Sequence, residues 1–243
     1  MAIADDFLDT GTAKFFQGQQ LTGTFAVTGT AITGTGSALT TELVAGQMVY
    51  DPVSRGIRKI ASTPSSTTAA TLDVAFNGNL TAGSTLYAMT DTGDTKGGID
   101  IEWSTETFEK ETDRRGKVGE VISDRNAKVT VPFAEWRPEN LKRAMAELLP
   151  LVTSSTKKLF RFSKSIGLDL TTLGTPCVVI PVLNGVETTD PNRIIVFHNL
   201  CPSKDTVQIK FGRTDQRPIT ASFMAWGLPD GEIGYVGDNS IRP

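Results

Sequence analysis

Residues 98–136 read GIDIEWSTETFEKETDRRGKVGEVISDRNAKVTVPFAEW, and this stretch decides the fold because two of its segments repeat with a period of two. From Ile99 to Thr107, apolar and threonine side chains alternate with Asp, Glu and Ser. From Ala127 to Phe133, apolar side chains alternate with Lys, Thr and Pro. Such alternation is typical of a strand with one buried and one solvated face. We therefore expect two long β-strands here.

The solvated faces of these two strands are charged and mostly acidic. Their members are Asp100, Glu102, Ser104 and Glu106 on the first strand, and Lys128 and Thr130 on the second. Paired carboxylates also occur in glycoside hydrolases. A regular strand without an aromatic-rich cleft nearby favours the simpler interpretation, a solvated acidic surface.

The connection between the two strands, Lys110 to Asn126, is dense in charge and contains Gly116 and Gly119. It is too long for a tight hairpin turn, so we expect either a mobile arm or a loop that docks on a partner. Its basic residues are Lys110, Arg114, Arg115 and Lys117. They suit a solvated loop tip or a contact with an acidic surface of another subunit. A nucleic-acid contact is the least favoured reading, since no aromatic side chain lies among them for base stacking.

The segment Leu21 to Thr92 differs from the rest in being rich in Thr, Gly, Ser and Ala and poor in charge. Short β-prone runs separated by turn residues predict a small all-β module. A flexible Thr/Gly linker is the alternative, but the segment carries enough large apolar residues for a core. These are Val49, Tyr50, Ile57, Ile60, Leu72, Val74, Phe76, Leu86 and Tyr87. We expect a module at 21–92 inserted into a core made of 1–20 and 93–243.

One helix and several further strands are expected outside these regions. Pro138 and Glu139 suit the first turn of a helix, and Pro150 ends it. The apolar side chains at helical spacing are Leu141, Ala144, Met145 and Leu148. Strands are predicted at 13–17, 158–163, 176–183, 193–199, 207–211 and 217–226. The fold class is therefore mainly β with one flanking helix.

The sequence carries no motif of a catalytic or cofactor-binding site. His198 is the only histidine, and we expect it to be structural because a triad or a metal site needs oriented partners. Cys177 and Cys201 are expected to be buried free thiols. The formal net charge of -3 disfavours a dedicated nucleic-acid binder. We expect no enzyme, no cofactor and no metal.

Neither a membrane segment nor an export signal is expected. No apolar run reaches the roughly 18 residues that a transmembrane helix needs. The first residues are acidic where a signal peptide is basic. Folding in a cytoplasm is the expectation.

The order of parts in residues 97–147 resembles the core of the major tail proteins, the tail tube proteins of long-tailed bacteriophages. It runs from an alternating strand through a charged loop to a second strand ending in an acid, then to a helix start at Glu139-Asn140-Leu141. The run 193–238, RIIVFHNLCPSKDTVQIKFGRTDQRPITASFMAWGLPDGEIGYVGD, is similar to the closing strands of that family. Simpler members lack an insert like 21–92.

The resemblance implies a structural virion protein whose core forms a β-sandwich or barrel. Hexameric rings of the chain would stack into a tube, with strands from each copy closing a barrel around the DNA channel and the insert decorating its outside. The six acidic-face residues would line that channel, where like charge lets DNA slide without sticking. The basic residues of the connection would contact a neighbouring subunit or ring.

The same resemblance implies partners and a location. Other copies of the chain, the tape measure, terminator and tail-tip proteins, and DNA in passage are the expected partners. The virion tail, assembled in the bacterial host cytoplasm, is the expected location. Two alternatives remain open: a head–tail connector or tail-tip ring of the same architecture, and a carbohydrate- or receptor-binding β module.

Overall fold

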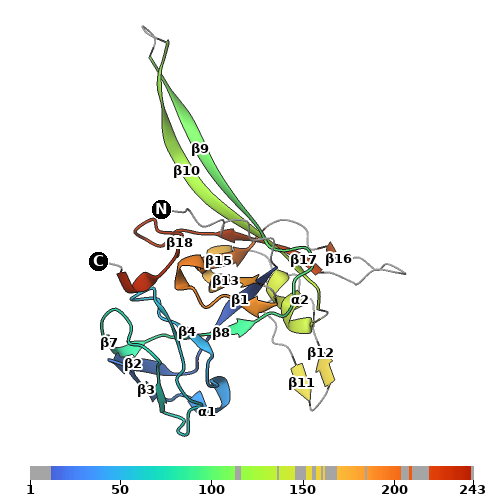
Figure 1. The fold of residues 1–243 in the computed structure, drawn as a ribbon. Helices are drawn as coiled ribbons and strands as arrows, with labels where there is room; N and C mark the ends of the chain where they lie inside the picture. The colour runs from blue at the N-terminus through green and yellow to red at the C-terminus, as the bar shows by residue number, and fades with distance from the viewer. Residues whose placement is uncertain are drawn as a thin grey trace, which may run out of the picture. The chain divides into compact units, whose positions relative to one another are not determined.

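The computed structural model describes residues 12–112, 116–135, 137–145, 152–154, 157–159, 161, 169–183, 185–203, 208–209 and 219–241 (Figure 1). The chain is mainly β with few helices, as its sequence predicts. It divides into two compact units. The first comprises Met1–Thr95, Thr175–His198 and Gly234–Pro243, and the second comprises Lys96–Gly174 and Asn199–Ile233.

The first unit is built on an antiparallel sheet in the order β5-β4-β8-β1-β13-β15. Its strands are β5 (Ile57–Lys59), β4 (Met48–Tyr50), β8 (Tyr87–Asp91), β1 (Ala13–Gln20), β13 (Thr175–Leu183) and β15 (Ile195–Pro202). Two short strands, β14 (Val186–Glu187) and β18 (Gly234–Val236), pair with β13 and β15. Short 3-10 turns, η2 (Pro191–Arg193) and η3 (Asn239–Ile241), complete the unit.

A smaller sheet in the same unit lies wholly within the predicted insert. Its order is β6-β3-β2-β7. Its strands are β2 (Thr24–Thr28), β3 (Ala31–Thr35), β6 (Ala69–Thr71) and β7 (Leu80–Ser84), and the short helix α1 (Leu39–Glu42) precedes β4. A buried cluster drawn entirely from residues 21–88 fills it, with Phe25, Val27 and Ile32 at its centre.

Strands β4 and β8 contribute to two cores at once because successive side chains of a strand point to opposite faces. Val49 and Ala88 belong to the small-sheet cluster. Met48, Tyr50 and Met89 belong to a second cluster, together with Phe16 and several residues of β13 and β15. Of the apolar residues expected in a separate insert core, Tyr50 therefore packs in the second cluster, as do Ile57 and Tyr87 at its margin, and Val74 is exposed.

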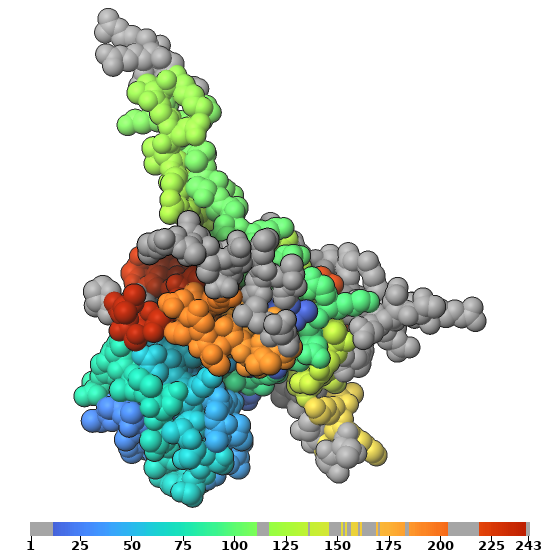
Figure 2. All heavy atoms as spheres, viewed as in Figure 1, coloured from blue at the N-terminus to red at the C-terminus, as the bar shows by residue number. Residues whose placement is uncertain are grey.

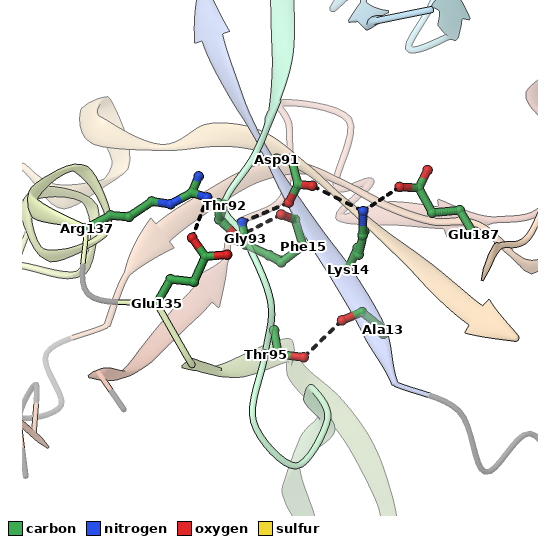
Figure 3. Close-up of polar contacts among 10 residues, drawn as sticks. All are labelled: Ala13, Lys14, Phe15, Asp91, Thr92, Gly93, Thr95, Glu135, Arg137 and Glu187. Atoms are coloured by element: carbon green, nitrogen blue, oxygen red, sulfur yellow. Dashed lines mark hydrogen bonds and ion pairs between the residues drawn. The ribbon is translucent and has the colours of Figure 1, made fainter. Parts of the chain in front are cut away.

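The predicted module boundaries at residues 21 and 92 do not coincide with the division into units. Residues 21–92 group with β1, since β8 pairs with β1 over five positions, from Gln20 opposite Tyr87 to Phe16 opposite Asp91. The residues that follow β8, Thr92 to Thr95, are also hydrogen-bonded to β1 (Figure 3). Thr92 donates its hydroxyl to the carbonyl oxygen of Phe15 at 2.8 Å, and Thr95 donates to that of Ala13 at 3.0 Å.

The second unit contains the ribbon β9 (Asp100–Thr112) and β10 (Gly116–Phe133), followed in sheet order by β17 (Ile219–Ala225). β17 also pairs with β16 (Gln208–Ile209) and with residues 200–202 of β15. Burial alternates perfectly along β17, with every second side chain buried from its first residue to its last. A two-stranded hairpin of β11 (Val152–Ser154) and β12 (Lys157–Leu159) and the 3-10 turn η1 (Leu170–Leu173) also belong to this unit.

The expected helix forms as α2 (Pro138–Ala144), with proline in its first turn and Glu139 beside it. Leu141 and Ala144 are buried, whereas Met145 is exposed. The helix has seven described residues, and Leu148 and Pro150 lie outside the described residues.

The histidine His198 and the two cysteines are buried. His198 is 5% exposed within β15, and its Nδ1 lies 2.8 Å from the Tyr50 hydroxyl, with the Tyr235 ring 5.7 Å away. Cys177 and Cys201 are free and buried, as predicted. Burial raises the pKa of the Cys201 thiol to about 11, with the negative charge of Asp169 adding to the effect.

Removing the hydroxyl of Tyr50 tests this buried pair. We expect Tyr50→Phe to lower the free energy of unfolding by about 1–2 kcal/mol, because the imidazole of His198 loses a buried partner. Urea denaturation measures the change. Tyr87→Phe is the matched control, because the described residues offer its hydroxyl no hydrogen bond. Equal effects of the two changes would contradict the assignment.

Candidate functional site

The β9–β10 ribbon is longer than the sequence predicts. The segment Lys110 to Asn126, expected to be a loop, is mostly strand: β9 runs to Thr112 and β10 begins at Gly116. Figure 1 shows the two strands side by side along their length. The pairing register shifts between Lys117 and Gly119 and again between Ile122 and Asp124. These bulges interrupt the period of two, and so the sequence pattern there does not look like a strand.

The register places all six predicted acidic-face residues on one face of the ribbon. Glu102 lies opposite Lys128, and Asp100 lies opposite Thr130. Directly opposed residues share a face, and so do residues two apart on one strand. Ser104 and Glu106 therefore extend the same face. The side chains of the four β9 members are exposed, and those of Lys128 and Thr130 are half-buried.

Two further residues of this face were missed by the sequence analysis. Asp124 lies opposite Glu106, and Asn126 lies opposite Ser104. The Asn126 amide donates to the Asp124 carboxylate at 2.8 Å. With Asp124 included, the face carries four carboxylates and one lysine. Extending the alternation of Ala127 to Phe133 back towards the N-terminus predicts Asn126 and Asp124 on this face, because the bulge at Ser123 lies before them.

Beyond Glu106 the same face becomes apolar. Phe108 lies opposite Val121, and the two side chains are 66% and 55% exposed. The opposite face carries Trp103, 61% exposed, and Ile122, 49% exposed. In Figure 2 no described residue of another element covers the outer part of the ribbon on the side in view. The expected buried face of β9 is therefore not buried by the described part of this chain.

Only the base of the ribbon is packed. Ala127, Val129, Val131 and Phe133 are fully buried, as their alternation predicts. They lie opposite Ala225, Phe223, Ala221 and Ile219 of β17. From residue 116 to residue 126, β10 pairs with β9 alone, and no described strand pairs with the outer edge of β9.

Of the four basic residues of the predicted loop, the structure describes two, Lys117 and Lys110. Lys117 lies near the far end of the ribbon and bridges two carboxylates, Glu109 at 2.5 Å and Glu120 at 2.7 Å. The hydrogen bond that Lys117 donates to Glu109, and then the one it donates to Glu120, raise the pKa of its ammonium. Lys110 is exposed opposite Gly119. Arg114 and Arg115 lie outside the described residues.

A second surface feature is a groove of about 1050 Å³ in the first unit. Its floor is the cluster of Phe16, Met48, Met89 and Ile180, and one wall is the C-terminal segment Gly237–Ser240. No sequence pattern predicts this groove, because its lining comes from segments up to about two hundred residues apart.

At one end of the groove Lys14 holds two carboxylates (Figure 3). Its ammonium donates to Glu187 at 2.8 Å and to Asp91 at 3.4 Å. The hydrogen bond to Glu187 is the main cause that raises the pKa of Lys14, and burial opposes it. The lysine stays protonated and joins β1 to β8 and β14.

Within the described residues, no three His, Cys, Asp or Glu side chains are grouped so that they could hold a metal ion. Among the same residues, no helix is long and apolar enough to cross a membrane. Neither observation assigns a function.

Comparison with known proteins identifies no relative: no protein-family model matches the chain, and no curated protein matches it.

A lysine placed at adjacent positions tests which face of β10 is packed. We expect Val129→Lys to lower the free energy of unfolding by about 3 kcal/mol or more, since it buries a charge against β17. Thr130→Lys, one residue later on the half-buried opposite face, should lower it by only about 1 kcal/mol, because the Thr130 hydroxyl loses its contact with that of Ser222 but the lysine lies opposite Asp100. Thermal unfolding of both variants measures the loss of stability. A larger loss in Thr130→Lys than in Val129→Lys would show that the face of Thr130, and not that of Val129, is the packed one.

Proposed function

We propose that the chain is a structural virion protein, a tail tube subunit that assembles into stacked hexameric rings around a DNA channel. The observation that carries the proposal is the β9–β10 ribbon, which has an open edge and exposed apolar side chains on both faces. A two-stranded ribbon is at best marginally stable alone in water. Strands of other copies would pair with its open edge, and their side chains would cover its exposed apolar residues.

The open edge of β9 supports self-assembly. β9 is 13 residues long and ends the sheet order of its unit. Long unpaired edges invite pairing with another chain, and closure into a barrel removes them. Repetition of the same contact around an axis makes a ring, and a second, head-to-tail contact makes a stack.

The charge of the ribbon supports a channel-facing position for one face. Asp100, Glu102, Glu106 and Asp124 share that face with Lys128, and Lys110 lies on it farther out, beyond Phe108. A lumen lined with carboxylates repels the phosphates of DNA, so that DNA passes without being held. The apolar side chains Trp103 and Ile122, on the other face, would pack against the outer layer of the assembled wall.

The proposal predicts the effect of charges placed on the ribbon. We expect Trp103→Glu and Ile122→Glu to abolish assembly, because a carboxylate cannot be buried between copies without a partner. Each single chain should keep its stability within about 0.5 kcal/mol, since both side chains are exposed before assembly. Negative-stain microscopy of purified protein reads assembly, and denaturant unfolding reads stability.

Val53→Glu is the matched control, because Val53 is 69% exposed and lies outside the ribbon. It should assemble like the unmodified chain. Tubes of uniform width support a tube subunit, and isolated rings support a connector or tail-tip ring. Compact monomers at every concentration would contradict the proposal. Affinity of those monomers for glycans would support the alternative of a carbohydrate- or receptor-binding β module.

Reversing the charge of the acidic face tests the channel separately. Assembled Glu102→Lys/Glu106→Lys tubes should retain short duplex DNA in a form protected from nuclease, because the lumen becomes cationic, and tubes of the unmodified chain should not. Asp94→Lys, an exposed change in the first unit, controls for added charge elsewhere. Retained DNA that nuclease digests freely would place these residues on the outside.

A further inference from the structure

The C-terminal segment of the first unit is held by two asparagine side chains. Asn239 is 8% exposed and donates its side-chain amide to the carbonyl oxygen of Ser54 at 3.1 Å. Asn77 donates its own amide to the carbonyl oxygen of Asn239 at 2.6 Å. The segment 237–241, of which Gly237–Ser240 line the groove, is thus tied to the turn between β4 and β5 and to the turn before β7.

Asn77 also has the chemical setting for a spontaneous reaction. It is exposed and precedes Gly78, whose φ of +105° and open surroundings leave the peptide nitrogen without a neighbouring Cβ in the way. In an Asn-Gly pair the nitrogen of glycine can attack the side-chain carbonyl carbon. No enzyme and no oxidant is needed, only water.

We propose that Asn77 is a deamidation site whose conversion to aspartate releases the C-terminal segment. The backbone nitrogen of Gly78 forms a bond to Cγ of Asn77 and gives up its proton, and the side-chain nitrogen leaves as ammonia. Water then adds to the cyclic imide and opens it to aspartate or isoaspartate. The net change is one water consumed and one ammonia released.

The product cannot make the hydrogen bond that Asn77 makes. The amide donates to a carbonyl oxygen, whereas a carboxylate is only an acceptor and faces that oxygen with like partial charge. Loss of the tie leaves the segment held by Asn239, by the pairing of β18 with β15, and by the backbone amide of Gly237, which donates to the carbonyl oxygen of Ile194 at 3.0 Å. The wall of the groove is thereby loosened, irreversibly and with time.

Asn79 provides a matched control two residues away. Its side-chain oxygen accepts a hydrogen bond from the backbone amide of Gly29 at 3.1 Å. Aspartate at position 79 keeps that acceptor, so Asn79→Asp adds the same charge to the same turn without breaking a bond. Asn77→Asp adds the charge and removes a donor.

Amide hydrogen exchange of the full chain measures release. We expect peptides covering residues 237–241 to exchange about five- to tenfold faster in Asn77→Asp than in the unmodified chain, which corresponds to one lost hydrogen bond. In Asn79→Asp the rates should stay within about twofold. Unchanged exchange in Asn77→Asp, or equal acceleration in both variants, would overturn the release mechanism.

Ageing the folded protein in mildly alkaline buffer tests the reaction itself. Peptide mapping by mass spectrometry should find aspartate and isoaspartate at position 77, and the modified fraction should show the fast exchange of Asn77→Asp. The chain has a second Asn-Gly pair, Asn184-Gly185, so mapping must separate the two. Modification that spares Asn77, or that reaches it only after denaturation, would overturn the assignment.

Discussion

Every strand with apolar side chains on both faces must be covered twice, and this constraint organises the molecule. A strand points successive side chains to opposite sides, so one layer of packing leaves half of them in water. In the first unit β4 and β8 meet the constraint within the chain, because Val49 and Ala88 enter one core while Met48 and Met89 enter another. In the outer part of the β9–β10 ribbon the described residues do not meet it, and Trp103 and Phe108 stay exposed.

The contrast between the base and the outer part of the ribbon gives the proposed assembly its physical basis. At the base, β17 pairs with β10 and extends the sheet, and Val129 and Phe133 are fully buried. Farther out, β9 and β10 remain paired, but no described side chains of other strands pack against them. Burial of apolar area is worth roughly 25 cal/mol per Å², so side chains of this size gain stability when another copy covers them. Conversely, the carboxylates on the acidic face gain nothing from burial and favour a position facing water.

Asparagine at position 77 connects the chemistry of the first unit with its architecture. The groove has an apolar floor that other strands hold in place, but its C-terminal wall depends on a few side-chain hydrogen bonds from Asn77 and Asn239. Such peripheral ties open more readily than a paired strand. The proposed deamidation of Asn77 therefore acts on the segment 237–241, which peripheral hydrogen bonds hold to the unit.

Much of the fold and part of the candidate site follow from the sequence by itself. The mainly β class, the helix start at Pro138, and the shared face of Asp100, Glu102 and Lys128 all follow from local rules of periodicity and turn chemistry. The extent of the ribbon does not, because bulges at Val118 and Ser123 reset the alternation and appear only once the partner strand is in register. The grouping of residues 21–92 with β1 and the groove beneath Met48 and Met89 were likewise decided only by the tertiary structure. Both depend on pairings between segments distant in sequence, and the residues of a single strand carry no record of which other strand will lie beside them.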